Sequence, residues 1–352
     1  MLQSGCNGLV VLLILDLTLT ENLSLNTEAS FDETTRREPP HSAREYLVHA
    51  ALFALTFVTT AIAGVQWLNK DPLELTNFPA GVSYAVLILL MLGSHEFGHY
   101  IAARIHGMKS TLPYFLPFPS FLGIFPFGTL GAVIRLKSPI PSRKVIFDVG
   151  SAGPLAGFLV SMVILIIGFL TLPSIDYLFS IHPEYAQMER IPTEGLTFGR
   201  SIFYSLFAWL FAPSGAFVPP MSEVYHYPFL CIGWFGMFVT AMNLIPIGQL
   251  DGGHISFAMF GTRYHLIAQV SLVLLVLLGS AGFLPLLNIP FEFGWTGWLF
   301  WALLLIGFMR LSRMNRPPVD DDTPLDPVRM FIGWICVLVF IGSFSLTPIE
   351  IR

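Results

Sequence analysis

Hydrophobic residues gather in seven long stretches of the chain, separated by polar, charged or proline-rich connections. About 20 predominantly apolar residues suffice to cross the hydrocarbon core of a bilayer as a helix. The sequence therefore predicts an all-α polytopic membrane protein with about seven transmembrane helices, at residues 45–68, 82–105, 147–171, 229–255, 264–287, 295–311 and 329–347. Pro246 interrupts the fourth stretch, and because proline removes a helical hydrogen bond, we expect a break there.

The connection Gly107–Arg143 is rich in both proline and phenylalanine. The prolines exclude a regular helix, and the phenylalanines make the segment too apolar for a solvated loop. We expect it to re-enter the membrane against protein, because backbone that is not helical must be shielded from lipid. Its end, Gly128–Lys137, has a β-like pattern around Val133 and Ile134. The sequence thus predicts a re-entrant β-like segment that binds substrate; a packed interfacial loop is the alternative.

Polar composition sets the remaining boundaries. Residues 1–43 have a short apolar run and no basic residue before Arg36, which predicts a polar, flexible tail without a secretory signal or transit peptide. Residues 44–311 form the membrane-embedded domain, residues 312–328 a cytoplasmic loop, and residues 329–352 a C-terminal transmembrane helix. Between the third and fourth stretches, residues 172–228 are rich in proline. The short apolar piece Ser201–Phe211 there predicts an interfacial or re-entrant helix.

The basic residues orient these helices. With the N-terminus in the cytoplasm, 14 of the 18 lysines and arginines fall on the cytoplasmic side. The charged fraction of 12% and the mean hydropathy of +0.69 exclude an ordinary soluble domain. The net charge is −5 and the basic residues form no block, so the charge pattern gives no indication of nucleic-acid binding. Three widely separated cysteines indicate neither a disulfide framework nor a thiolate metal site.

Candidate chemistry lies in the second apolar stretch, as the H-E-x-x-H pattern His95–His99. Two residues four apart on a helix share one face, so the imidazoles of His95 and His99 could occupy two corners of a Zn²⁺ site. Glu96, about 100° around the helix, could then serve as the base for a metal-bound water. Ionisable groups at membrane depth favour a functional site. A polar patch that joins helices, or a haem or transport histidine pair, is the alternative.

A catalytic zinc needs a third protein ligand, and few acids are available inside the predicted helices. Only Glu96 and Asp251 lie well within them. Asp251 follows the break at Pro246, so it is either the third ligand or a cap of the helix that follows. His254 is either a supporting residue of the site or an interfacial histidine.

Two motifs together resemble the signature of the site-2 protease family of intramembrane zinc metalloproteases. H-E-x-x-H stands at His95–His99, and N-x-x-P-x-x-x-L-D-G stands at Asn243–Gly252, both without departure. The small residues of Ser151–Gly157 add a family-like element that lets helices pack closely. The resemblance covers roughly residues 80–260, the predicted core of the protease domain. No PDZ domain fits the external segment.

The resemblance implies one Zn²⁺ per chain, with His95, His99 and Asp251 as ligands and Glu96 as general base. It implies hydrolysis of peptide bonds in single-span membrane-protein substrates within the lipid bilayer. Asn243 could hydrogen-bond substrate or the developing oxyanion, or make an ordinary interhelical bond. The segment around Val133 and Ile134 could hold unwound substrate by strand addition. We expect a multi-pass protein of a prokaryotic plasma membrane. A metal transporter or sensor, and a membrane-anchored protease of soluble substrates, are the alternatives.

Overall fold

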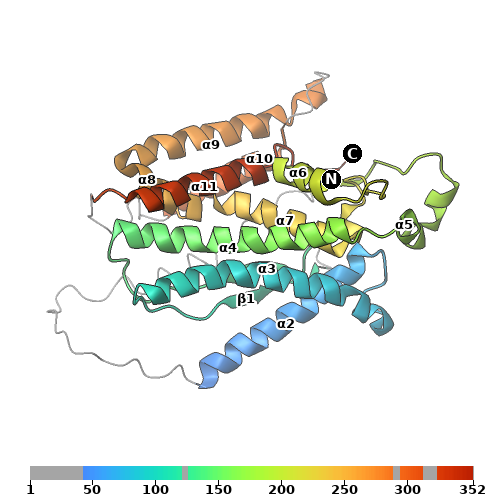
Figure 1. The fold of residues 1–352 in the computed structure, drawn as a ribbon, viewed down its shortest axis with the longest axis horizontal. Helices are drawn as coiled ribbons and strands as arrows, with labels where there is room; N and C mark the ends of the chain where they lie inside the picture. The colour runs from blue at the N-terminus through green and yellow to red at the C-terminus, as the bar shows by residue number, and fades with distance from the viewer. Residues whose placement is uncertain (1–42, 121–125, 288–293, 312–322, 352) are drawn as a thin grey trace.

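A computed structural model describes residues 43–120, 126–287, 294–311 and 323–351. Its helices run roughly along one direction, as Figure 1 shows for α3, α4, α9 and α11. The predicted tail at residues 1–43 and most of the predicted loop at residues 312–328 lie outside the described residues.

Three helices form the centre of the fold: α3 (Phe78–Ile105), α4 (Arg143–Leu170) and α7 (Pro228–Asn243). Small residues bring them together. A Cβ on Gly98 of α3 would lie 2.5 Å from the carbonyl oxygen of Ala152 on α4. On α7, a Cβ on Gly233 would lie 2.8 Å from the Cβ of Leu165 on α4. The close packing predicted for the small-residue motif is therefore confirmed.

The connection between α3 and α4 contains a β-hairpin. Strand β1 (Tyr114–Pro117) pairs antiparallel with β2 (Thr129–Val133), with Tyr114 opposite Val133. The hairpin packs against α2 (Ala43–Trp67) through β1. The β-like prediction for Gly128–Lys137 is confirmed over residues 129–133, whereas its position relative to the membrane stays a prediction.

The segment between α4 and α7 is folded rather than extended. It contains α5 (Ile175–Ile181), η3 (Pro183–Gln187), β3 (Leu196–Phe198), α6 (Ile202–Phe211) and η4 (Val224–His226). The helix expected at Ser201–Phe211 is confirmed as α6. Strand β3 pairs antiparallel with β4 (Ile349–Ile351) near the end of the chain. This segment and the end of the chain therefore lie on the same side of the molecule.

The remaining helices cover the side of α7 and α4 away from α2. The break predicted at Pro246 is confirmed, because α7 ends at Asn243 and α8 (Asp251–Phe260) begins seven residues after Leu244. The next elements are η5 (Gly261–Arg263) and α9 (Tyr264–Ala281), and η6 (Leu284–Leu287) follows. They lead to α10 (Gly297–Leu311) and α11 (Pro327–Ser343).

Large apolar side chains are exposed along these outer helices. On α9, Val273 and Leu277 are 56% and 60% exposed, and on α11, Phe331 and Leu338 are 67% and 60% exposed. Such faces are stable in hydrocarbon and costly in water. Within the described residues, four helical segments are long and apolar enough to cross a membrane: Ala43–Trp67, Leu75–Ile105, Arg143–Leu170 and Asp251–Ala281. The mostly helical architecture with membrane-length apolar helices is confirmed, and the count of seven crossings stays a prediction.

Candidate metal centre

Two histidines of α3 and one aspartate of α8 converge in the centre of the molecule. The Nε2 atoms of His95 and His99 lie 3.1 Å apart, and Asp251 Oδ2 lies 3.4 Å from each of them. Both imidazoles are buried. In a tetrahedral zinc site with bonds of about 2.0–2.1 Å, neighbouring ligand atoms stand about 3.3 Å apart. The three side chains therefore fit a Zn²⁺ ion, and together they could hold a metal.

The protein around His99 fixes which ring nitrogen faces this cluster. His99 Nδ1 lies 2.7 Å from the carbonyl oxygen of Val149 on α4. A carbonyl only accepts, so Nδ1 carries the hydrogen and Nε2 presents its lone pair to the cluster. Such a second hydrogen bond is the usual support of a metal-binding histidine.

Glycines of α4 make room for the two imidazoles. A Cβ on Gly153 would lie 2.1 Å from His99 Nε2, and a Cβ on Gly157 would lie 3.2 Å from His95 Nδ1. A Cβ at Gly153 would therefore overlap the His99 imidazole, so any side chain there would displace that ring. In the sequence, the motif Ser151–Gly157 predicts close helix packing. The sequence does not reveal that this motif contacts both histidines, or that the carbonyl of Val149 accepts a hydrogen bond from His99.

Asp251 is the first residue of α8, whereas Leu250 occupies the cap position, without a side-chain hydrogen bond. Its carboxylate faces the two histidines rather than capping the helix. The break between α7 and α8 makes this possible, because it lets the carboxylate approach α3. Asn243, the last residue of α7, places its amide nitrogen 3.5 Å from His95 Nε2. Asn243 thus lies beside the cluster, as the motif predicts.

Glu96 lies next to the same cluster, and its carboxylate accepts a hydrogen bond from the backbone N–H of Ile134. This bond joins α3 to the residue that follows β2. It also means that Ile134 contacts the predicted base through its backbone, a contact that side-chain patterns do not reveal. Val133 lies one residue before it, opposite Tyr114 of β1. His254 lies on α8, where its Cβ is 3.3 Å from the position of a Cβ on Gly150.

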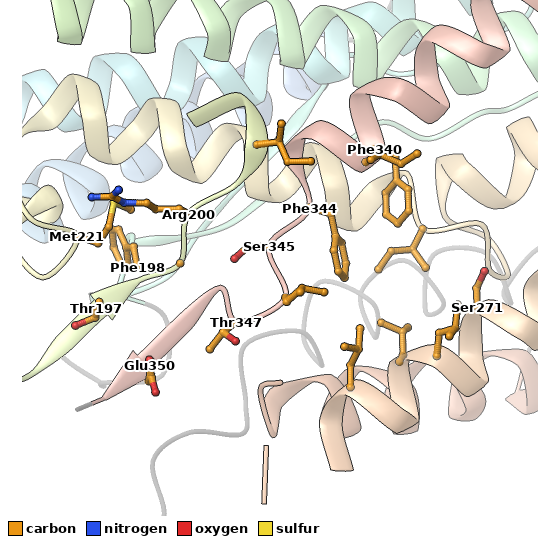
Figure 2. Close-up of a pocket in the computed structure, with 18 of the residues that line it drawn as sticks. Thr197, Phe198, Arg200, Met221, Ser271, Phe340, Phe344, Ser345, Thr347 and Glu350 are labelled. Carbon is orange, nitrogen blue, oxygen red and sulfur yellow. The ribbon is translucent and has the colours of Figure 1, made fainter. Parts of the chain in front are cut away.

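A large cavity of about 860 Å³ lies apart from the three candidate ligands. Figure 2 shows Phe340 of α11, Phe344 just after it and Ser271 of α9 on one side of it, and Thr197 and Glu350 of the β3–β4 sheet on the other. Its lining also includes Ile245 and Pro246, in the break between α7 and α8. The cavity reaches the break that precedes Asp251, but its lining includes none of His95, His99 and Asp251.

The amino-acid sequence is similar to those of known proteins. A rice protein (Oryza sativa subsp. indica) named "Probable zinc metalloprotease EGY2, chloroplastic" is 30% identical over 241 residues, which cover 67% of this chain and 40% of that protein. A second rice protein (Oryza sativa subsp. japonica), "Probable zinc metalloprotease EGY1, chloroplastic", is 33% identical over 181 residues, or 51% of this chain and 28% of that protein. From Arabidopsis thaliana, "Probable zinc metallopeptidase EGY3, chloroplastic" is 27% identical over 336 residues, or 89% of this chain and 52% of that protein.

These relatives are named chloroplastic, so they lend no support to the expected prokaryotic plasma membrane. The chain spans 28% to 52% of the length of these three relatives. Zinc is the metal that their names and the His–His–Asp cluster imply together. The family model for peptidase family M50 matches residues 83–284, more than half of the 352 residues, and these residues contain both motifs. The chain therefore belongs to peptidase family M50, the site-2 protease family of zinc metalloproteases.

Proposed function

We propose that this chain is an intramembrane zinc metalloprotease that hydrolyses peptide bonds within or near the transmembrane segments of membrane-protein substrates. The observation that carries the proposal is the convergence of His95, His99 and Asp251, with Glu96 beside them, among long apolar helices. A buried set of ionisable groups at this depth is costly unless a metal satisfies it, and it favours a functional site.

His95, His99 and Asp251 would hold the zinc ion. Bound zinc supplies Lewis-acid chemistry: it makes water more acidic near neutral pH and polarises a carbonyl group. Glu96 would take a proton from the attacking water and later deliver it to the leaving amine. The hydrogen bond from Ile134 orients this carboxylate. The amide of Asn243 would donate to substrate or to the developing oxyanion.

The outer edge of β2 would hold the substrate. Within the described residues, β2 pairs only with β1, so its other edge is available. The backbone of Arg135 faces the β1 side, because its carbonyl accepts from the N–H of Thr111. Backbone groups alternate along a strand, so Ala132 and Ile134 face the outer edge and Val133 faces β1. A transmembrane substrate must unwind before cleavage, and this edge could pair with the unwound segment.

The decisive test is cleavage by the Glu96→Gln variant. Wild-type and variant chains would be reconstituted in liposomes with a single-span substrate, and the products would be identified by mass spectrometry. The variant keeps the size and polarity of Glu96 but cannot accept a proton. We expect it to bind zinc normally and to cleave about 10²–10⁴-fold more slowly.

The exposed Glu194→Gln variant is the matched control and should cleave like the wild type. Loss of zinc from Glu96→Gln would make Glu96 a ligand and overturn its role as base. Zinc uptake into the liposomes without cleavage by the wild type would favour the metal transporter instead.

A further inference from the structure

A second group of histidine and glutamate side chains lies at the opposite end of α7 from Asn243. It consists of His182, which precedes η3, and of Glu223 and His226, which flank and end η4. One ligand atom from each residue lies within 4.8 Å of the others. The 16 residues of α7, about 24 Å of helix, lie between this group and Asn243. None of these residues belongs to the motifs of the peptidase family described above.

The hydrogen bonds of the two histidines aim two lone pairs at each other. His226 Nδ1 lies 2.6 Å from the carbonyl oxygen of Trp67, which only accepts, so the hydrogen is on Nδ1. His182 Nδ1 lies 3.0 Å from a carboxylate oxygen of Glu184 and carries its hydrogen likewise. The two Nε2 atoms then face each other 3.0 Å apart. A cation between them, either a proton or a metal ion, is needed to make this contact favourable.

Glu223 distinguishes a metal ion from a proton. Its side chain is only 2% exposed, and Oε2 has no hydrogen-bond partner although it lies 3.4 Å from His226 Nε2. Oε1 accepts from the hydroxyl of Tyr185 at 3.4 Å. A buried carboxylate oxygen without a partner is costly. A proton shared by the imidazoles would leave Oε2 without a hydrogen bond, whereas a metal ion would coordinate it.

We propose that His182, Glu223 and His226 form a second metal site, which binds a divalent transition metal and suits Zn²⁺ best. Two imidazoles and one carboxylate are typical zinc ligands, whereas Mg²⁺ and Ca²⁺ prefer oxygen ligands throughout. The separations of 3.0 and 3.4 Å match the 3.1 and 3.4 Å of the His95–His99–Asp251 cluster. Each histidine also has the second hydrogen bond that metal-binding histidines require.

The position of this second site indicates a structural role. Its ligands join η3 to η4, and η4 leads directly into α7. His226 connects them to Trp67 at the end of α2, and the hydroxyl of Tyr177 donates to the His226 carbonyl at 2.7 Å. A metal ion here fastens the segment between α4 and α7 to the end of α2 and fixes where α7 begins.

Metal counting on the full chain tests the proposal. The chain would be purified through a tag without histidine, equilibrated with Zn²⁺, dialysed, and analysed by inductively coupled plasma mass spectrometry. We expect about two Zn²⁺ per wild-type chain and about one in His182→Ala. His182 is the best target, because its side chain is 16% exposed and its loss is least harmful to folding. Asp251→Ala should also retain about one ion, and the double variant about none.

Two further variants separate the possible results. The exposed His265→Ala should keep both ions, which controls for adventitious binding to histidine. Glu223→Gln keeps the shape of the side chain and should lose the second ion while the first remains, which shows that the chain is folded. The same zinc content in wild type, His182→Ala and Glu223→Gln would overturn the second site and leave a proton between the imidazoles. Loss of zinc from Asp251→Ala alone would also overturn the second site, and it would support the His95–His99–Asp251 site.

Discussion

At the scale of single residues, two glycines of α4 make room for the histidines of the candidate metal centre. The His99 imidazole packs directly over Gly153, and Gly157 lies against His95. Because their α-carbons carry no side chain, α3 and α4 approach closely and both imidazoles stay beside α4. The same closeness lets the Val149 carbonyl reach His99 Nδ1. The Ser151–Gly157 motif therefore belongs to the site.

Alanine at these two glycines should have graded effects. At Gly153 the new Cβ would stand 2.1 Å from His99 Nε2, so Gly153→Ala should lose most of its zinc and be destabilised by about 1–3 kcal/mol. At Gly157 the nearest atom would be 3.2 Å away, so Gly157→Ala should keep zinc with a smaller loss of stability. Bound metal and thermal unfolding measure both effects. Equal zinc content in the two variants would contradict the close contact at Gly153.

At the scale of elements, the residue after β2 contacts α3, and among the described residues β2 pairs with β1 alone. The N–H of Ile134 is already engaged with Glu96, so the neighbouring outward group for substrate is that of Ala132. The register with β1 decides which residues of β2 face its outer edge. The pattern of side chains in the sequence does not decide it.

Proline at Ala132 should weaken cleavage through the loss of one backbone donor. We expect Ala132→Pro to cleave about fivefold more slowly, since a single hydrogen bond contributes about 1 kcal/mol. Ala132→Ser, which retains the N–H, is the matched control, and Val133→Ala should have little effect. Unchanged zinc content verifies that the site remains folded. If Ala132→Pro cleaves at the wild-type rate, substrate does not pair with this edge.

A second junction of elements lies where α11 begins. Arg329 of α11 donates two hydrogen bonds to Asp148 of α4, at 2.8 and 2.6 Å, and also pairs with Asp326. Asp148 in turn lies 2.9 Å from His106 Nε2, at the end of α3. These contacts connect α3, α4 and α11 at the same end of the molecule.

This junction predicts a pH dependence at the start of α11. Hydrogen bonds from the Arg329 side chain and backbone hold the pKa of Asp326 below its ordinary value. A carboxyl with a depressed folded-state pKa stabilises above its unfolded pKa of about 3.9, and this contribution is lost as pH falls through the folded value. The protection of the Arg329 amide, which donates to Asp326, against hydrogen exchange should therefore fall below about pH 4, when each measured rate is compared with the intrinsic rate at the same pH. Asp326→Asn should flatten this pH dependence; an unchanged profile would exclude Asp326 as its cause.

At the scale of the whole molecule, the β3–β4 pair places the segment between α4 and α7 on the same side as the end of the chain. The connections at Gly261–Arg263 and before Pro327 lie toward the other end of the helices (Figure 1). This arrangement agrees with the orientation that the basic residues predict. In that orientation, the side with the β3–β4 pair is external.

Labelling with a membrane-impermeant thiol reagent tests that orientation. Single cysteines would replace Met188, which is 47% exposed, and Val328, which is 67% exposed, in a chain whose native cysteines are changed to serine. In sealed cells the Met188→Cys variant should be labelled, and Val328→Cys should be labelled only after the membrane is opened. Metal content controls for folding. Labelling of both positions before opening would contradict their assignment to opposite sides.

The sequence by itself determined the long apolar helices, the break at Pro246 and the candidate ligands His95, His99 and Asp251. Helix length, proline chemistry and the scarcity of ionisable groups in apolar stretches act locally, so they are visible along the chain. Only the tertiary structure decided what depends on contacts between distant segments. It set the place of Gly153 beside His99, the bond from Ile134 to Glu96, and the meeting of His182 with Glu223 and His226. These residues lie tens of positions apart, and only helix packing brings them within reach of each other.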